Sequence, residues 1–289
     1  MVEAENRENL IKCPVCYSKD FVFLYSKKDS KLEIEDRRLR CRSCGVIFVQ
    51  NRLSPDFIIR KFYVKRNPIG PTEKYLRKKN HLKKIAERLE KFLPEGASVF
   101  DIGCGGGAFL RFMLDKGYKV SGLEVGEAAK EEAERVLGIK DVVRVGDFLE
   151  TDFKDEIFDA VVLTDVIEHF HNPRVYLEKI SSILKPGDLI IIRTPNSDSL
   201  MHRLLKSRWM LASPRHVVLY NRESTSFLLM KNSFCIIDFC NEKGIQGKFI
   251  PPFSYGITRV LKGFLINSLH WFFGAIGQGE SITIFARKT

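Results

Sequence analysis

An apolar segment that ends in an acid and a run of glycines constrains this chain more than any other feature. Residues 98–107 read Ser-Val-Phe-Asp-Ile-Gly-Cys-Gly-Gly-Gly, which predicts a strand over 98–102, a glycine turn, and a helix from about residue 107 to 116. Ligands of open α/β sheets bind where strands end, and glycines let the backbone approach a ligand closely. The sequence therefore predicts a ligand-binding α/β domain.

The segments around this motif alternate between strand and helix patterns. Strand–helix alternation indicates a mostly parallel sheet with helices on both faces. Residues 194–222 read as a long irregular stretch, and the last strand pattern lies at 281–287. Further strands are predicted over 118–123, 141–145, 158–163, 189–193 and 235–239, and further helices over 72–92, 127–137, 173–184 and 223–231.

Polar residues follow the other predicted strands. Glu124 ends the second strand, where a carboxylate can accept hydrogen bonds from both hydroxyls of a ribose. A ribose-binding acid at this distance also suits a nicotinamide enzyme, so Glu124 alone does not discriminate. Asp101 argues against that alternative, because a carboxylate beside the glycine turn would repel a pyrophosphate.

The D-x-G-x-G-x-G spacing over 101–107, with acids at matching strand ends, resembles the class I S-adenosylmethionine (SAM)-dependent methyltransferases. The resemblance covers roughly residues 72–289. It implies an open, mostly parallel, seven-stranded Rossmann-like sheet with an antiparallel last strand. It also implies that Asp147 meets the adenine amino group and that Phe148 frames the adenine ring. The implied SAM-binding residues are Asp101, Gly103, Gly105, Gly107, Glu124, Asp147, Phe148 and Thr164.

Two Cys-x-x-Cys pairs lie near the N-terminus. Cys13 and Cys16 form the first pair, Cys41 and Cys44 form the second, and 24 residues lie between the two pairs. Four thiolates match the tetrahedral preference of structural zinc, with iron as the main alternative. A segment this short cannot build a sufficient core, so the metal would supply folding energy.

This segment resembles the ribbon that precedes many bacterial and archaeal methyltransferases of cell-surface sugar and natural-product pathways. The expected organisation is a zinc ribbon over 1–50, a linker over 51–71 and the SAM-dependent methyltransferase domain over 72–289.

Two histidines are candidate bases for a hydroxyl acceptor, which must lose a proton on methylation. His169 follows the fourth strand, and Glu168 could orient it, although a scaffold role for this Glu-His pair is the alternative. Asp165, Glu168 and His169 would share a helix face and could hold a divalent metal if a helix began there. His216 lies in a Trp…Pro-x-His segment that, in the family resembled, borders the acceptor site.

The leading function is methyl transfer to a small-molecule acceptor, which is a sugar, lipid-linked or phenolic compound, with oxygen favoured as the acceptor atom. The net charge of +11 leaves open an RNA methyltransferase that uses the ribbon and basic surface. It is less favoured, because the fourth motif lacks the Asn/Asp-Pro-Pro-aromatic form. A non-enzymatic SAM-binding adaptor is a third alternative.

The apolar segment 249–277 predicts an acceptor-site lid, or a surface helix that contacts membrane. The polar N-terminus does not resemble a secretory signal, so we expect a cytoplasmic protein, with peripheral membrane contact as an alternative.

Overall fold

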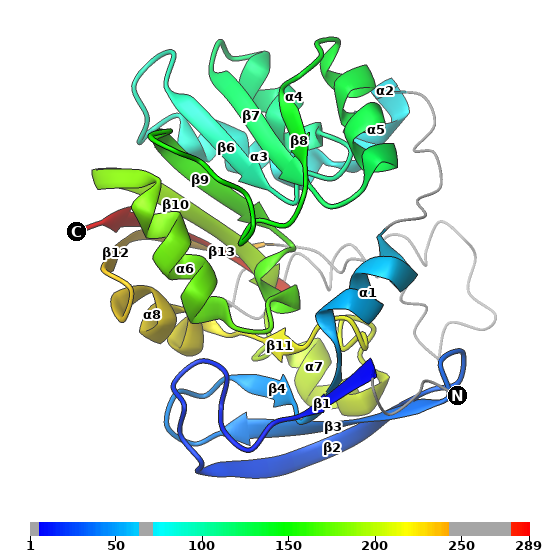
Figure 1. The fold of residues 1–289 in the computed structure, drawn as a ribbon. Coiled ribbons are helices and arrows are strands. Elements are labelled where there is room, and N and C mark those ends of the chain that lie inside the picture. The colour runs from blue at the N-terminus through cyan, green and yellow to red at the C-terminus, as the bar shows by residue number, and fades with distance from the viewer. Residues whose placement is uncertain (1–5, 64–71, 243–278) are drawn as a thin grey trace, which may run out of the picture.

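The computed structural model describes residues 6–63, 72–242 and 279–289. It contains a seven-stranded sheet and a separate four-stranded sheet. Three of the four strands of the smaller sheet come from the N-terminal segment (Figure 1).

The seven-stranded sheet has the order β12-β13-β10-β9-β6-β7-β8. Neighbouring strands from β10 to β8 are parallel, and β13 is antiparallel to both β10 and β12. This arrangement confirms the predicted fold class. The strands are β6 (Ser98–Ile102), β7 (Lys119–Glu124), β8 (Val143–Val145), β9 (Phe158–Thr164), β10 (Leu184–Pro195), β12 (Phe234–Glu242) and β13 (Ser281–Lys288).

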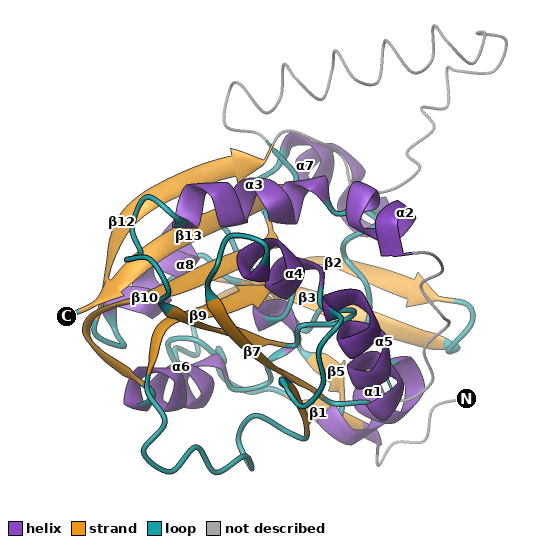
Figure 2. Ribbon diagram, turned by 90° about the horizontal axis from the view of Figure 1, so that it is seen from above, coloured by secondary structure: helices purple, strands orange, loops and turns teal. Residues whose placement is uncertain are grey.

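Helices cover both faces of this sheet (Figure 2). Successive strand side chains point to opposite faces. Val99 accordingly packs in the core formed with α3 and α4, and Phe100 packs in the core formed with α6 and α8. The helices are α2 (Thr72–Lys78), α3 (Asn80–Leu89), α4 (Ala108–Leu114), α5 (Glu127–Leu137), α6 (Pro173–Ser182), α7 (Leu200–Leu205) and α8 (Arg222–Met230).

The single helix predicted over 72–92 was wrong. Lys79, with φ −102° and ψ 24°, leaves the helical region and separates α2 from α3. The buried face of Leu82, Ile85, Ala86 and Leu89 belongs to α3 alone, so the apolar spacing indicated the second helix and not the first. The stretch 194–222 is also less irregular than predicted, since it contains α7 and the short strand β11 (Val218–Leu219).

The N-terminal segment, residues 7–62, is here called the ribbon, and it folds around antiparallel strands. Its sheet has the order β11-β4-β3-β2, and β1 pairs with β5 beside it. The strand β3 was not predicted, because its sequence is mostly charged and it buries Asp36 and Arg38 together with the apolar Ile34 and Leu39. The elements are β1 (Arg7–Asn9), β2 (Phe21–Asp29), β3 (Ile34–Cys41), β4 (Ile47–Val49), β5 (Asn51–Leu53) and α1 (Pro55–Phe62).

The ribbon and the large sheet are joined through β11. This strand follows the candidate base His216 and pairs antiparallel with β4 of the ribbon (Figure 1). The backbone N–H of Val49 adds a hydrogen bond of 3.0 Å to the carbonyl of Val217. Phe48 of the ribbon lies in the same hydrophobic core as Val161 of β9. The core therefore runs from one sheet into the other.

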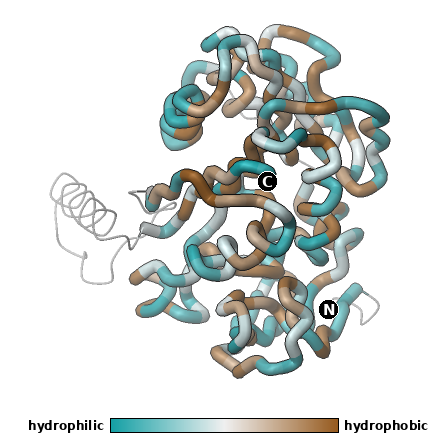
Figure 3. The backbone as a smooth tube through the Cα atoms, turned by 90° about the vertical axis from the view of Figure 1, so that its left-hand side faces the viewer, coloured by the Kyte–Doolittle hydropathy of each residue, from teal (hydrophilic) through white to brown (hydrophobic). Residues whose placement is uncertain are grey.

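Hydrophobic and hydrophilic stretches alternate along the chain (Figure 3), as expected of amphipathic elements. None of the helices within the described ranges is long and apolar enough to cross a membrane. The apolar segment 249–277 and residues 64–71 of the expected linker lie outside the described residues.

We predict that Arg38→Met lowers the free energy of unfolding by about 3–5 kcal/mol. Arg38 is fully buried, 3.7 Å from the carboxylate of Asp36, and its loss would leave that buried acid with Arg7, at 3.6 Å, as its remaining ion-pair partner among the described residues. Urea unfolding checks the value. The matched control is Arg42→Met, whose ion pair with Asp20 is exposed and contributes about 0–1 kcal/mol. Equal stability losses in the two variants would contradict the expected role of Arg38.

Candidate active site

A cavity of about 420 Å³ lies where β6, β7, β8 and β9 end. The parallel strands place their carboxyl ends at one edge of the sheet, so residues far apart in sequence meet there. Six of the predicted cofactor-binding residues line this cavity, namely Gly103, Gly105, Glu124, Asp147, Phe148 and Thr164.

The glycine loop and Glu124 hold each other in place. The N–H of Gly105 donates to Oε2 of Glu124 at 2.8 Å, and the N–H of Val125 donates to Oε1 at 3.0 Å. Gly103 has φ 68°, and a Cβ added there would come within 2.7 Å of Cγ2 of Val166. Only glycine fits position 103 without a shift of Val166. The two hydrogen bonds hold the carboxylate of Glu124 at the cavity wall.

Asp101 and Gly107, which were also predicted to bind the cofactor, do not line this cavity. Asp101 is buried, and neither carboxylate oxygen has a hydrogen-bond partner among the described residues. Burial, and then the charge of Glu124, raise the pKa of Asp101 well above its usual range. Gly107 caps α4 with φ 72°, and a Cβ there would lie 3.1 Å from Ala133 of α5. Close helix packing explains this glycine.

Asp147 and Phe148 form another wall. The Oδ1 of Asp147 accepts a hydrogen bond from the N–H of Leu149 at 2.6 Å, which fixes the carboxylate in the loop after β8. The ring of Phe148 stacks on Tyr176 with centroids 6.0 Å apart and planes 16° apart. This wall offers an acid beside a flat apolar surface, which suits a purine ring.

The two candidate histidines meet at the same cavity, with ring centroids 4.9 Å apart. The Nδ1 of His216 donates to the carbonyl of Leu211 at 2.6 Å, so in the neutral ring Nε2 carries the lone pair. Burial, then the charges of His169 and Arg215, lower the pKa of His216 well below its usual range. His216 is therefore neutral at physiological pH and able to accept a proton at Nε2.

Both nitrogens of His169 have partners. Its Nδ1 donates to the carbonyl of Arg215 at 2.8 Å, and Tyr63 Oη lies 3.1 Å from its Nε2. Burial lowers the pKa of His169 to about 4. His169 therefore forms a half-buried link between Tyr63 and the segment that carries His216.

The prediction that Glu168 orients His169 was wrong, because no hydrogen bond joins them in the described structure. Oε2 of Glu168 instead accepts from the hydroxyl of Thr194 at 3.0 Å, and Oε1 has no hydrogen-bond partner among the described residues. Burial, and then the charge of Asp165, raise the pKa of Glu168 to about 8. At pH 7 this carboxyl group is mainly neutral.

Helical spacing predicted that Asp165, Glu168 and His169 could hold a divalent metal ion, but the structure groups different side chains. Asp165 has φ 59° and pairs with Arg193, so no α-helix begins there. A short 3₁₀ turn, Ile167–His169, follows it. Glu168, His169 and His216 instead offer ligand atoms within 4.8 Å of one another, a spacing that a cation can bridge.

Tyr63 and Arg215 line the cavity but were not predicted as site residues. Tyr63 follows α1, in the segment expected to be a linker, and reaches His169 from 106 positions away in sequence. No local pattern signals such a contact.

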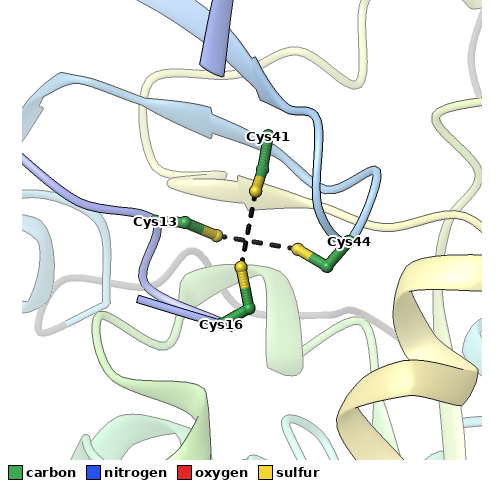
Figure 4. Close-up of side chains that lie close together, drawn as sticks. All are labelled: Cys13, Cys16, Cys41 and Cys44. Carbon is green, nitrogen blue, oxygen red and sulfur yellow. Dashed lines mark hydrogen bonds between the residues drawn. The ribbon is translucent and has the colours of Figure 1, made fainter. Parts of the chain in front are cut away.

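The four paired cysteines converge in the ribbon (Figure 4). Their sulfur atoms all lie within 4.8 Å of one another, with 3.7 Å between Cys13 and Cys44 and 3.4 Å between Cys16 and Cys41. Zinc–sulfur bonds of about 2.3 Å in a tetrahedron place sulfurs about 3.8 Å apart. The donor set therefore fits a tetrahedral metal ion.

A family model described as a methyltransferase domain matches residues 74–235. The chain belongs to this methyltransferase family. This methyltransferase is 28% identical over 133 residues to the ubiquinone biosynthesis O-methyltransferase of Pectobacterium atrosepticum, a match that covers 44% of this chain and 51% of that protein. The chain spans about half the length of the curated relatives that it matches.

Solved structures show the same fold. A SAM-dependent methyltransferase from Archaeoglobus fulgidus has a TM-score of 0.51 at 22% identity, covering 72% of this methyltransferase and 94% of that chain. The magnesium protoporphyrin IX methyltransferase of Synechocystis, solved with bound S-adenosylhomocysteine (SAH), has a TM-score of 0.52 at 17% identity, covering 81% and 98%.

We predict that Glu168→Gln becomes more stable relative to the wild type as the pH rises from about 4.5 to about 8. The folded pKa lies above the ordinary 4.5, so the folded state holds a proton that the unfolded chain has released. Wild-type stability therefore falls through this window, by about 1.4 kcal/mol for each unit of pKa difference. Urea unfolding across this range measures the difference.

The control for this prediction is Glu178→Gln, an exposed position on α6. It should leave the pH dependence unchanged. A stability difference between Glu168→Gln and the wild type that is constant with pH would contradict the raised pKa.

Proposed function

We propose that this protein transfers the methyl group of SAM to the oxygen of a small-molecule acceptor. The observation that carries the proposal is the cavity itself, which joins the strand-end residues Gly105, Glu124 and Asp147 to the histidine pair. The proposed cofactor-binding groups and the proposed proton acceptor thus line one cavity.

The residues present fit SAM. Glu124, held by two backbone N–H groups, retains lone pairs for the ribose hydroxyls. Asp147 would accept a hydrogen bond from the adenine amino group, and Phe148 would contact the ring. The glycine loop would let the amino-acid part of SAM lie against the backbone. When bound, SAM supplies the activated methyl group.

His216 would serve as the base. An acceptor hydroxyl bound beside His216 would donate its proton to Nε2 of the imidazole. Burial keeps the imidazole neutral, and the hydrogen bond to Leu211 keeps the lone pair on Nε2. The same burial excludes water, which would otherwise compete for the base.

The size of the cavity supports a small acceptor. Its volume of about 420 Å³ lies within the range of small-molecule sites. The curated relatives named as O-methyltransferases of ubiquinone biosynthesis support a small acceptor that is methylated on oxygen. Phenolic, sugar and lipid-linked compounds are the acceptor classes to screen first.

Zinc is the metal we propose for Cys13, Cys16, Cys41 and Cys44. Four thiolates fill a tetrahedral shell and leave no position for substrate, so the ion would be structural. The sulfur spacings described above support this assignment.

Two substitutions should separate cofactor binding from turnover. Glu124→Gln is expected to weaken SAH binding about 10- to 100-fold, since it replaces a charged hydrogen-bond acceptor to the ribose. His216→Ala is expected to bind SAH as the wild type does and to lose about 100- to 10,000-fold in turnover, since only the base is removed. Calorimetry measures SAH binding, and methyl transfer from labelled SAM to an acceptor found by screening measures turnover.

Glu127→Gln, at an exposed position on α5, is the control for Glu124 and should leave SAH affinity unchanged. Binding of NAD in place of SAH would contradict the proposed cofactor. Unchanged turnover in His216→Ala would contradict the assignment of the base and leave the cofactor proposal standing.

A further inference from the structure

Arg215 occupies the histidine side of the cavity. Its side chain lines the cavity, its carbonyl accepts the hydrogen bond from Nδ1 of His169, and the next residue is His216. The guanidinium carbon lies 6.0 Å from the ring centroids of Phe62 and Tyr63. A permanent positive charge therefore sits beside the proposed base.

Within the described ranges, the guanidinium of Arg215 makes no ion pair or hydrogen bond. Other arginines of this part of the molecule are paired: Arg193 with Asp165, and Arg52 with Glu8. A cation in a cavity gains most from a charged partner that reaches it there.

The rest of the chain offers little to neutralise Arg215. Segments 64–71 and 243–278 contain lysine and arginine but no aspartate or glutamate, and residues 1–5 contribute only Glu3 and Glu5. No carboxylate from the two longer undescribed segments can pair with this guanidinium.

The acids that line the cavity have other partners. Glu124 and Asp147 accept backbone N–H groups at the proposed cofactor side. Asp165 pairs with Arg193, and Glu168 is hydrogen-bonded to Thr194. These acids therefore do not neutralise the positive charge of Arg215 at the histidine side of the cavity.

We propose that Arg215 binds an oxyanion of the methyl acceptor, so that the acceptor is an anionic small molecule carrying a carboxylate or a phosphate group. This inference rests on the proposed function and narrows its substrate class. A guanidinium presents paired N–H donors that match the two oxygens of either group. Anchored there, the acceptor would place a neighbouring hydroxyl at His216.

The test uses protein saturated with SAH, so that the cofactor site is filled. Calorimetry compares two matched pairs of probes: 3,4-dihydroxybenzoate against catechol, and phenyl phosphate against phenol. In the wild type we expect the anionic member of at least one pair to bind about tenfold tighter or more than its neutral partner. The pair that responds shows whether carboxylate or phosphate is recognised.

Arg215→Gln should abolish this preference, and Arg215→Lys should retain part of it. Arg203→Gln removes the same charge from an exposed position on α7 outside the cavity, and it should keep the full preference. SAH affinity should stay unchanged in all three variants.

Three results would overturn the inference: no anion preference in SAH-saturated wild type, a preference that survives Arg215→Gln, or SAH binding weakened by Arg215→Gln. The last would assign the guanidinium to the carboxylate of the cofactor. Failure of the wild type to bind SAH would instead overturn the proposed function, and this inference with it.

Discussion

The backbone pairing between β4 of the ribbon and β11 is the interaction on which the acceptor half of the site depends. It fixes Val218 and Leu219 directly after the segment that carries Arg215 and His216. Arg38 of the ribbon reinforces it, donating to the carbonyl of Ser213 at 2.9 Å and of His216 at 3.2 Å. Because Arg38 is fully buried, these charged hydrogen bonds act where water does not compete. The ribbon is thus part of the wall that positions the proposed base.

The two halves of the cavity have different physical origins. The cofactor half follows from the sheet, because parallel strands deliver Gly105, Glu124 and Asp147 to one edge. The acceptor half is assembled from three separate segments: Tyr63 after α1, His169 after β9, and the segment before β11. Hydrogen bonds from Tyr63 to His169, and from His169 to Arg215, connect them. We propose that the first half binds the cofactor and that the second binds the acceptor.

This difference decides what could be predicted from the sequence. The alternation of strands and helices and the glycine loop follow from local patterns, whereas the antiparallel last strand was implied by the family resemblance. Glu124, predicted from its place at a strand end, lines the cavity. Asp101 is buried and does not line the cavity, because a strand-end pattern does not say which of the last side chains faces a ligand. The metal set of Asp165, Glu168 and His169 failed because spacing presupposes a helix, whereas Asp165 adopts a left-handed conformation. Tyr63 and Arg38 act through contacts 106 and 178 residues away, which no local pattern reveals.

Hydrogen–deuterium exchange on SAH-bound protein, before and after removal of the ribbon metal with a chelator, tests the role of the ribbon most directly. We predict that residues 211–220 lose protection together with the ribbon, while the glycine loop at 98–107 keeps its protection. Metal analysis of the same samples should show one zinc ion per chain before treatment. Full protection of residues 211–220 in a ribbon that has lost its own would contradict the account, because the base would then be held without the ribbon.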